Sequence, residues 1–226
     1  MPSPLLPRFE MESGPAPTAA VILLHGLGAS GHDFAGLVET LDLGGCQDMR
    51  FVFPHAPVMP VTVNGGHSMP AWYDIRSLDL QGEQDVAGIQ RSELAVLALI
   101  AHEVQRGIAP EHIVLAGFSQ GAALTLHTAL RHPFKLAGIM ALSGYLLLPE
   151  RLGRERAPAN AHTPIFMAHG VDDSVVLPRR GEEARDALRA LGHPVQWHSY
   201  PAEHNVTADE VQDMAAFLRQ VLPALQ

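Results

Sequence analysis

Residues 117–121 read Gly117-Phe118-Ser119-Gln120-Gly121, and the segments on either side decide how this motif folds. Before it, residues 113–116 form a short apolar run, typical of a strand buried on both faces. After it, residues 122–127 have the composition of the start of a helix. A G-x-S-x-G motif between a strand and a helix indicates a nucleophile elbow, whose serine hydroxyl projects from the edge of a sheet. We therefore expect a side chain at either glycine to collide with the neighbouring strand or helix. Without this context, the motif would be an ordinary glycine-rich turn.

Strand-like apolar runs alternate with helix-like segments along the chain. The expected strands are residues 20–24, 51–53, 113–116, 136–142, 165–168 and 195–200. The expected helices are residues 33–43, 84–105, 122–131, 180–191 and 208–222. Residues 56–80 and 149–164 show no periodicity and are expected to be long loops. This alternation predicts an α/β fold, with a mostly parallel central sheet flanked by helices on both faces. Ligands of such sheets bind at the carboxyl ends of the strands.

The composition is that of an ordinary globular protein of 226 residues with a net charge of −9. This charge argues against a nucleic-acid partner, because binding to phosphate backbones relies on an excess of Lys and Arg. Residues 1–18 contain five prolines and no signal-peptide pattern, and the longest apolar run, residues 94–101, is far too short to span a membrane. We expect a cytoplasmic protein without stable membrane insertion. We also expect one domain over residues 20–226, with residues 1–19 as a proline-rich segment that is part of it or packed on it.

An activated serine needs a base to take its proton and an acid to hold that base. With a nucleophile elbow, these groups follow in the chain order serine, acid, histidine, each after a later strand. Asp172 and Asp173 follow the expected strand that ends at residue 168, and either could be the acid. His204 follows the last expected strand, whereas His198 lies inside it and is typical of a structural or surface histidine. The sequence thus predicts Ser119, one of the two aspartates and His204.

Several further motifs occur in a fixed order. They are Leu24-His25-Gly26-Leu27-Gly28 with Gly31-His32-Asp33-Phe34, Phe53-Pro54-His55-Ala56-Pro57, Pro60-Val61-Thr62-Val63-Asn64-Gly65-Gly66, Met69-Pro70-Ala71-Trp72-Tyr73-Asp74-Ile75, the elbow itself, His169-Gly170 with Asp173 and Val176, and Tyr200-Pro201 before His204. With these motifs, the chain from about residue 20 onward resembles the carboxylesterase/acyl-protein thioesterase family, in its bacterial carboxylesterase form. The resemblance implies an α/β-hydrolase fold without a separate lid domain.

The resemblance also assigns roles to individual residues. Its pattern H-G-x-x-D-x-x-V selects Asp173 over Asp172. An oxyanion needs two backbone N–H donors, and the residue after the nucleophile, Gln120, supplies one. The resemblance indicates Leu27 for the other. His25 is expected to brace this loop through hydrogen bonds.

The substrate side of the site is predicted less directly. Trp72 is expected to line the acyl pocket beside Met69, although packing beneath a long loop explains both about equally well. Leu146 and Leu27 would complete a shallow apolar groove. The sequence departs from the commoner family form at Ala122, where many relatives carry a glycine, so we expect tighter packing there. It also departs at residues 144–149, so acyl-chain length does not transfer.

The expected function is a serine hydrolase that cleaves carboxylic esters of short to medium acyl chains through an acyl-enzyme on Ser119. An acyl-protein thioesterase or a lysophospholipase would use the same triad and is the alternative. An inactive acyl-binding protein is the alternative from a different class. No metal or organic cofactor is expected, because the histidines lack a spacing such as H-E-x-x-H. The expected partner is a small ester or thioester, and the oligomeric state stays open, with a homodimer as one option.

Overall fold

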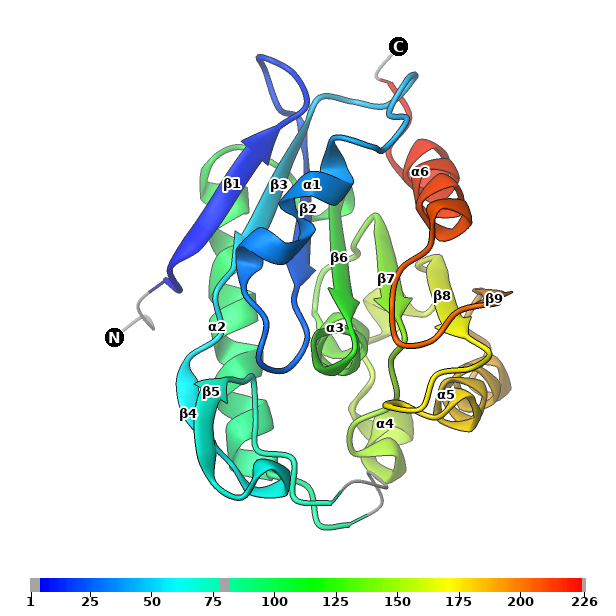
Figure 1. Cartoon of the computed structure of the whole chain (residues 1–226). Coiled ribbons are helices and arrows are strands. Elements are labelled where there is room, and N and C mark those ends of the chain that lie inside the picture. Colours follow the sequence, from blue (N-terminus) through cyan, green and yellow to red (C-terminus); the bar gives the residue numbers. More distant parts are fainter. Residues whose placement is uncertain (1–4, 78–81, 225–226) are drawn as a thin grey trace.

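The computed structural model describes residues 5–77 and 82–224, which form a seven-stranded sheet covered by helices on both faces (Figure 1). The strands lie in the order β1-β3-β2-β6-β7-β8-β9. Their bounds are β1 Arg8–Glu12, β2 Ala19–Leu24, β3 Met49–Pro54, β6 Ile113–Phe118, β7 Gly138–Leu142, β8 Ile165–Gly170 and β9 Val195–Tyr200. The helices are α1 Ala35–Val38, α2 Val86–Gln105, α3 Gln120–Arg131, α4 Pro149–Glu155, α5 Pro178–Ala190 and α6 Ala208–Val221.

From β3 to β9, neighbouring strands run parallel, so their carboxyl ends meet at one edge of the sheet. The strand β1 pairs antiparallel with β3 at the other end of the strand order, with Arg8 opposite Pro54 and Glu12 opposite Arg50. The sequence did not predict β1, which lies within the proline-rich segment. The fold confirms the predicted α/β class and its mostly parallel sheet.

Alternate residues of each strand face two separate cores. Ile22, Leu115 and Met167 belong to the core beneath α2, α3 and α5. Their neighbours Val21 and Val114 belong to the second core, beneath α1 and α6. The strands are therefore apolar without a break because both faces of the sheet are covered.

Two segments differ from the expectation. The helix expected over residues 33–43 is a 3₁₀ turn, Gly31–Phe34, followed by the single turn of α1. The hydroxyl of Thr40 donates to the carbonyl of Leu37 at 2.7 Å, and the amide of Leu41 bonds back only three residues, so the helix tightens and ends. The segment expected to be a loop over residues 56–80 contains a hairpin of β4 Val58–Val61 and β5 His67–Pro70, joined by a 3₁₀ turn, Thr62–Asn64.

The second expected loop, residues 149–164, also contains structure. It holds α4 and a 3₁₀ turn at Pro158–Asn160, and a further 3₁₀ turn, Pro110–His112, precedes β6. Both elements in residues 149–164 are short, so no separate lid domain lies between β7 and β8. Among the described residues, none of the helices combines the length and apolar character needed to cross a bilayer.

Candidate active site

Ser119 sits in the turn between β6 and α3, at the carboxyl edge of the sheet (Figure 1). Its φ of 56° lies in the left-handed region, which a residue with a side chain adopts only when its surroundings enforce it. A Cβ on Gly117 would come within 3.0 Å of the backbone of Gly121, and one on Gly121 within 3.0 Å of the carbonyl of Leu24. Both glycines thus permit the close approach that the strained turn requires, as the sequence predicted.

The imidazole of His204 connects Ser119 with Asp173. Its Nε2 lies 2.9 Å from the hydroxyl oxygen of Ser119, and its Nδ1 lies 2.6 Å from Oδ2 of Asp173. Because an ionised carboxylate can only accept, Nδ1 carries the proton and Nε2 is left to accept from the serine hydroxyl. This is the tautomer that a base needs in order to remove the serine proton.

Asp173 is 1% exposed, and the backbone around it fixes its carboxylate. Its Oδ1 accepts hydrogen bonds from the amides of Val175 (2.9 Å) and Val176 (2.8 Å), which leaves Oδ2 for the histidine. The neighbouring residue, Asp172, is exposed to solvent. His169 packs beside the acid and bonds to the carbonyl of Val176 at 2.8 Å, and burial lowers its pKa. The structure thus brings together Ser119, His204 and Asp173, and not Asp172.

The competing histidine, His198, lies elsewhere. It is in β9, where its ring stacks on Phe166 at 4.8 Å between centroids and its Nδ1 lies 3.4 Å from a carboxylate oxygen of Asp213. His204 is in the loop after β9, with its ring 4.7 Å from that of Phe118. These contacts match the structural role that the sequence indicated for His198.

Two backbone amides near Ser119 have no acceptor among the described residues. They are the amide of Gln120, at the first position of α3, and that of Leu27, in the turn after β2. A Cβ on Gly26 would lie 3.4 Å from the Cβ of Ser119, so this turn packs directly against the serine. Free N–H groups on both sides of a nucleophile are the arrangement that stabilises an oxyanion.

Trp72 had two expected roles, in an acyl pocket or in packing beneath a loop. It is 2% exposed, and its indole N–H donates to the backbone carbonyl of His25 at 2.8 Å. Its ring also packs against that of His25, with 5.2 Å between centroids. The burial favours the packing role that the sequence had left open over a place in an acyl pocket.

Sequence reasoning missed the side-chain network beneath Gln120. The Gln120 amide group accepts from the backbone N–H of Trp72 at 3.0 Å and donates to the carbonyl of Tyr73 at 2.7 Å. The hydroxyls of Tyr73 and Tyr145 lie 2.8 Å apart in a fully buried setting. Burial raises the pKa of Tyr145 to about 12, so both phenols stay protonated at neutral pH. No local sequence signal could have revealed this network, because its bonded members are 47 to 72 residues apart in the sequence.

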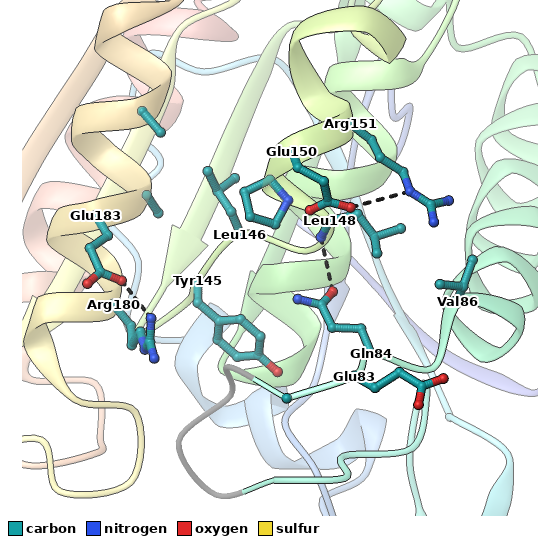
Figure 2. Close-up of a pocket in the computed structure, with 14 residues that line it drawn as sticks. Glu83, Gln84, Val86, Tyr145, Leu146, Leu148, Glu150, Arg151, Arg180 and Glu183 are labelled. Atoms are coloured by element: carbon teal, nitrogen blue, oxygen red, sulfur yellow. Dashed lines mark hydrogen bonds and ion pairs between the residues drawn. The ribbon is translucent and has the colours of Figure 1, made fainter.

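A cavity of about 610 Å³ opens at the same edge of the sheet (Figure 2). Leu146, Leu148 and Ala184 give it apolar walls, and Glu183 and Arg151 are among the charged residues that line it. Figure 2 shows the side chain of Gln84 bonded to the amide of Leu148, at 3.0 Å, which ties the start of α2 to the segment after β7.

Two of the four apolar residues expected to form one groove line different cavities. Leu146 lines the cavity of Figure 2, whereas Trp72 lines a separate cavity of about 230 Å³ with Pro57 and Met59. Met69 is half-buried in β5, and its sulfur lies 3.1 Å from the side-chain nitrogen of Asn64. A Cβ on Gly28 would be 3.8 Å from the same sulfur, so Met69 lies beside the turn that contains Leu27.

One cluster in the described part of the chain has the spacing of metal ligands, formed by Glu10, His102 and Glu103. Its carboxylates are already engaged by cations: Arg50 and Arg106 each lie 2.9 Å from Glu103, and Arg106 also lies 2.9 Å from Glu10. The guanidinium groups neutralise the charge that a metal would need, so these residues fit an ion-pair network between β1, β3 and α2.

Comparison with known proteins agrees with the fold and the motifs. Residues 9–222 match the family described as phospholipase/carboxylesterase. A protein of Gibberella zeae named acyl-protein thioesterase 1 is 41% identical over 215 residues, covering 91% of this chain and 92% of that protein.

Two solved structures are similar over most of their length. The crystal structure of Zea mays acyl-protein thioesterase 2 superposes with a TM-score of 0.83 at 28% identity, covering 95% of this chain and 98% of the other. The crystal structure of esterase PE8 has a TM-score of 0.80 at 32% identity, with 96% and 99% covered. Proteins named as thioesterases and as an esterase are therefore both similar to this chain.

Proposed function

This chain belongs to the phospholipase/carboxylesterase family of α/β-hydrolases, and we propose that it is a serine hydrolase of acyl thioesters and carboxylic esters. The observation that carries the proposal is the hydrogen-bonded series from Ser119 through His204 to Asp173, with 2.9 and 2.6 Å between the bonded atoms. The similar proteins support a hydrolase. Their names favour the thioesterase alternative over the ester-only function that the sequence put first.

In the proposed mechanism, the hydroxyl oxygen of Ser119 attacks the acyl carbonyl while Nε2 of His204 takes its proton. Asp173 stabilises the imidazolium that forms. The negative charge on the carbonyl oxygen is held by the amides of Leu27 and Gln120. His204 then gives its proton to the departing thiolate or alkoxide. A water molecule, deprotonated by the same histidine, attacks the acyl-enzyme. The bond between the acyl carbon and the Ser119 oxygen then breaks, His204 returns the proton to that oxygen, and the carboxylic acid leaves.

The acyl chain is proposed to extend from Ser119 toward Leu146 and the cavity of Figure 2. Each buried methylene contributes about 0.8 kcal/mol to binding, so kcat/KM should rise with chain length until the apolar walls are covered. The segment between β7 and β8 contains only short elements, so we expect an open site. Turnover should therefore show no jump when a substrate passes its micelle threshold.

The nucleophile can be tested with a fluorophosphonate probe. Wild-type protein should be labelled at Ser119, and Ser119→Ala should lose both labelling and turnover while its unfolding midpoint stays near that of the wild type. His204→Ala should likewise abolish turnover, whereas His198→Ala should keep it. Labelling at another serine would overturn the assignment, and a folded wild-type protein that neither reacts nor hydrolyses would indicate an acyl-binding protein instead.

The substrate class can be tested with matched pairs of oxyesters and thioesters that share the same acyl chain, from short to long. Comparable kcat/KM values within a pair would support the proposal for both classes. Turnover of thioesters alone would narrow it to a thioesterase. Turnover that begins only with aggregated long-chain lipids would contradict the open site and favour a lipase-like enzyme. A cytoplasmic location remains a prediction from the sequence.

A further inference from the structure

The two free amides beside Ser119 belong to segments that are far apart in the sequence. One is the amide of Gln120, at the start of α3, and the other is that of Leu27, in the turn after β2. An oxyanion hole works only when both donors are fixed before the reaction, because reorienting them would consume the free energy that they supply. Other residues must therefore hold the two segments in fixed positions relative to each other.

Trp72 is bonded to both segments. Its indole N–H donates to the carbonyl of His25, two residues before Leu27, at 2.8 Å. Its backbone N–H donates to the side-chain oxygen of Gln120 at 3.0 Å. The side-chain nitrogen of Gln120 then donates to the carbonyl of the next residue, Tyr73, at 2.7 Å, so the glutamine is held at two points.

His25 fixes the orientation of the Leu27 amide. Its Nδ1 donates to the carbonyl of Gly26 at 2.7 Å, and its Nε2 accepts from the amide of Ala56 at 3.0 Å, so the ring is neutral. Burial lowers the pKa of His25, against the opposing effect of the bond to Gly26. The carbonyl of Gly26 and the amide of Leu27 belong to one planar peptide group, so fixing the oxygen also fixes the direction of the N–H.

We propose that Trp72 is a positioning residue that holds the two oxyanion-hole amides in place through its hydrogen bonds to His25 and Gln120. The inference rests on the proposed function and replaces the substrate contact that the sequence suggested for this tryptophan. Trp72 is 2% exposed, so it offers a substrate little surface. Its two N–H groups bond to the two segments that carry the oxyanion-hole amides.

The test is Trp72→Phe, which removes the indole N–H and keeps the backbone N–H and most of the aromatic bulk. Removal of a whole oxyanion donor costs about 10²–10³-fold in kcat, so we expect misalignment to cost about 10- to 100-fold, with KM within about twofold. A trifluoromethyl ketone that carries the same acyl chain, and whose hemiketal oxyanion occupies the hole, should lose affinity by a similar factor.

Two variants serve as controls. Ser92→Ala removes a different hydrogen bond to the same residue, from the serine hydroxyl to the carbonyl of Trp72, so it loosens the packing without touching either N–H group. Trp197→Phe makes the same exchange at the other tryptophan, which packs under Arg185. Both should keep kcat within about twofold of the wild type.

If Trp72→Phe does not fold, Gln120→Met carries the test, because it removes both side-chain bonds and keeps the amide of residue 120. It should show the same loss of kcat at unchanged KM. A rise in KM alone, or a loss of kcat no larger than that of Ser92→Ala, would overturn the proposal while the wild type remained an active hydrolase. A wild type without turnover would refute the proposed function, and this inference with it.

Discussion

Gly144 lies against the methyl group of Ala122, so closely that a Cβ at position 144 would come 2.7 Å from the Cβ of Ala122. Ala122 is in the first turn of α3, directly behind the elbow, and Gly144 belongs to the segment that leaves β7. The backbone fixes the position of a Cβ, so neither the Cβ of Ala122 nor one at position 144 could rotate out of this contact. The methyl group of Ala122 is thus accommodated by the glycine facing it.

We predict that Gly144→Ala destabilises the protein by about 1–3 kcal/mol, the usual cost of overpacking. Ala122→Gly alone should cost about 0.5–1 kcal/mol, because glycine weakens a helix. The double variant should recover much of the loss, giving a favourable coupling of about 1 kcal/mol in urea unfolding. Additive effects would show that the two positions do not constrain each other.

The second prediction concerns the choice between the two aspartates. Asp173→Asn should lower kcat by about 10⁴-fold, because its amide nitrogen would face Nδ1 of His204 and favour the wrong tautomer. The control, Asp172→Asn, changes an exposed neighbour and should have a mild effect. Steady-state kinetics with one activated ester distinguish the two. A larger loss of kcat in the Asp172 variant would show that Asp172, and not Asp173, is the acid of the triad.

The third prediction concerns stability against pH. Burial raises the pKa of Glu210 to about 7, although a backbone hydrogen bond with Thr207 opposes the shift, and Asp213 adds to it. Between about pH 4.5 and 7, the folded state keeps a proton that the unfolded state has lost. The free energy of unfolding should therefore fall as the pH rises through this window, by up to about 3 kcal/mol from this group.

Glu210→Gln removes this titration while keeping a polar side chain at the start of α6. The variant should be more stable than the wild type at pH 8 and close to it at pH 4.5. Urea unfolding of both proteins across this range measures the difference, which isolates Glu210 because every other titratable group is the same in both proteins. Parallel curves for the two proteins would contradict the raised pKa.

The fourth prediction concerns the ion pairs that tie β1 and β3 to α2. Glu103 is 1% exposed and contacts both Arg50 and Arg106 at 2.9 Å. Glu103→Ala leaves these guanidinium groups without their buried partner and should cost about 3 kcal/mol in the free energy of unfolding. Glu183→Ala removes an exposed pair with Arg180 and should cost less than about 1 kcal/mol. Equal losses would show that burial does not strengthen the network.

The sequence predicted the parts of the structure that depend on neighbouring residues. The elbow, its two glycines and the parallel strands follow from short apolar runs and from residues that tolerate close backbone approach. The positions of His204 and of the aspartate pair followed because each lies directly after a strand. Parallel strands place their carboxyl ends together, so chain order combined with position after successive strands predicted that these groups would meet Ser119.

Other features were missed or misjudged because they depend on contacts between distant segments. The edge strand β1 has half-buried, mixed residues, and only its pairing with β3 makes it a strand. The expected helix after residue 33 ends early, where the hydroxyl of Thr40 donates a hydrogen bond to the backbone carbonyl of Leu37. The sequence left the role of Trp72 open between pocket and packing, because its partners, His25 and Gln120, lie 47 and 48 residues away.

The sequence by itself determined the alternation of the parallel strands with helices, the turn at Ser119 and the candidate base, because these depend on periodicity and on the chain's local steric limits. Only the tertiary structure decided which side chains hold the oxyanion amides, which apolar residues line the cavity beside Leu146, and how Gly144 makes room for Ala122. Such choices depend on close packing between segments that the fold brings together, and a single methyl group or N–H is enough to change them.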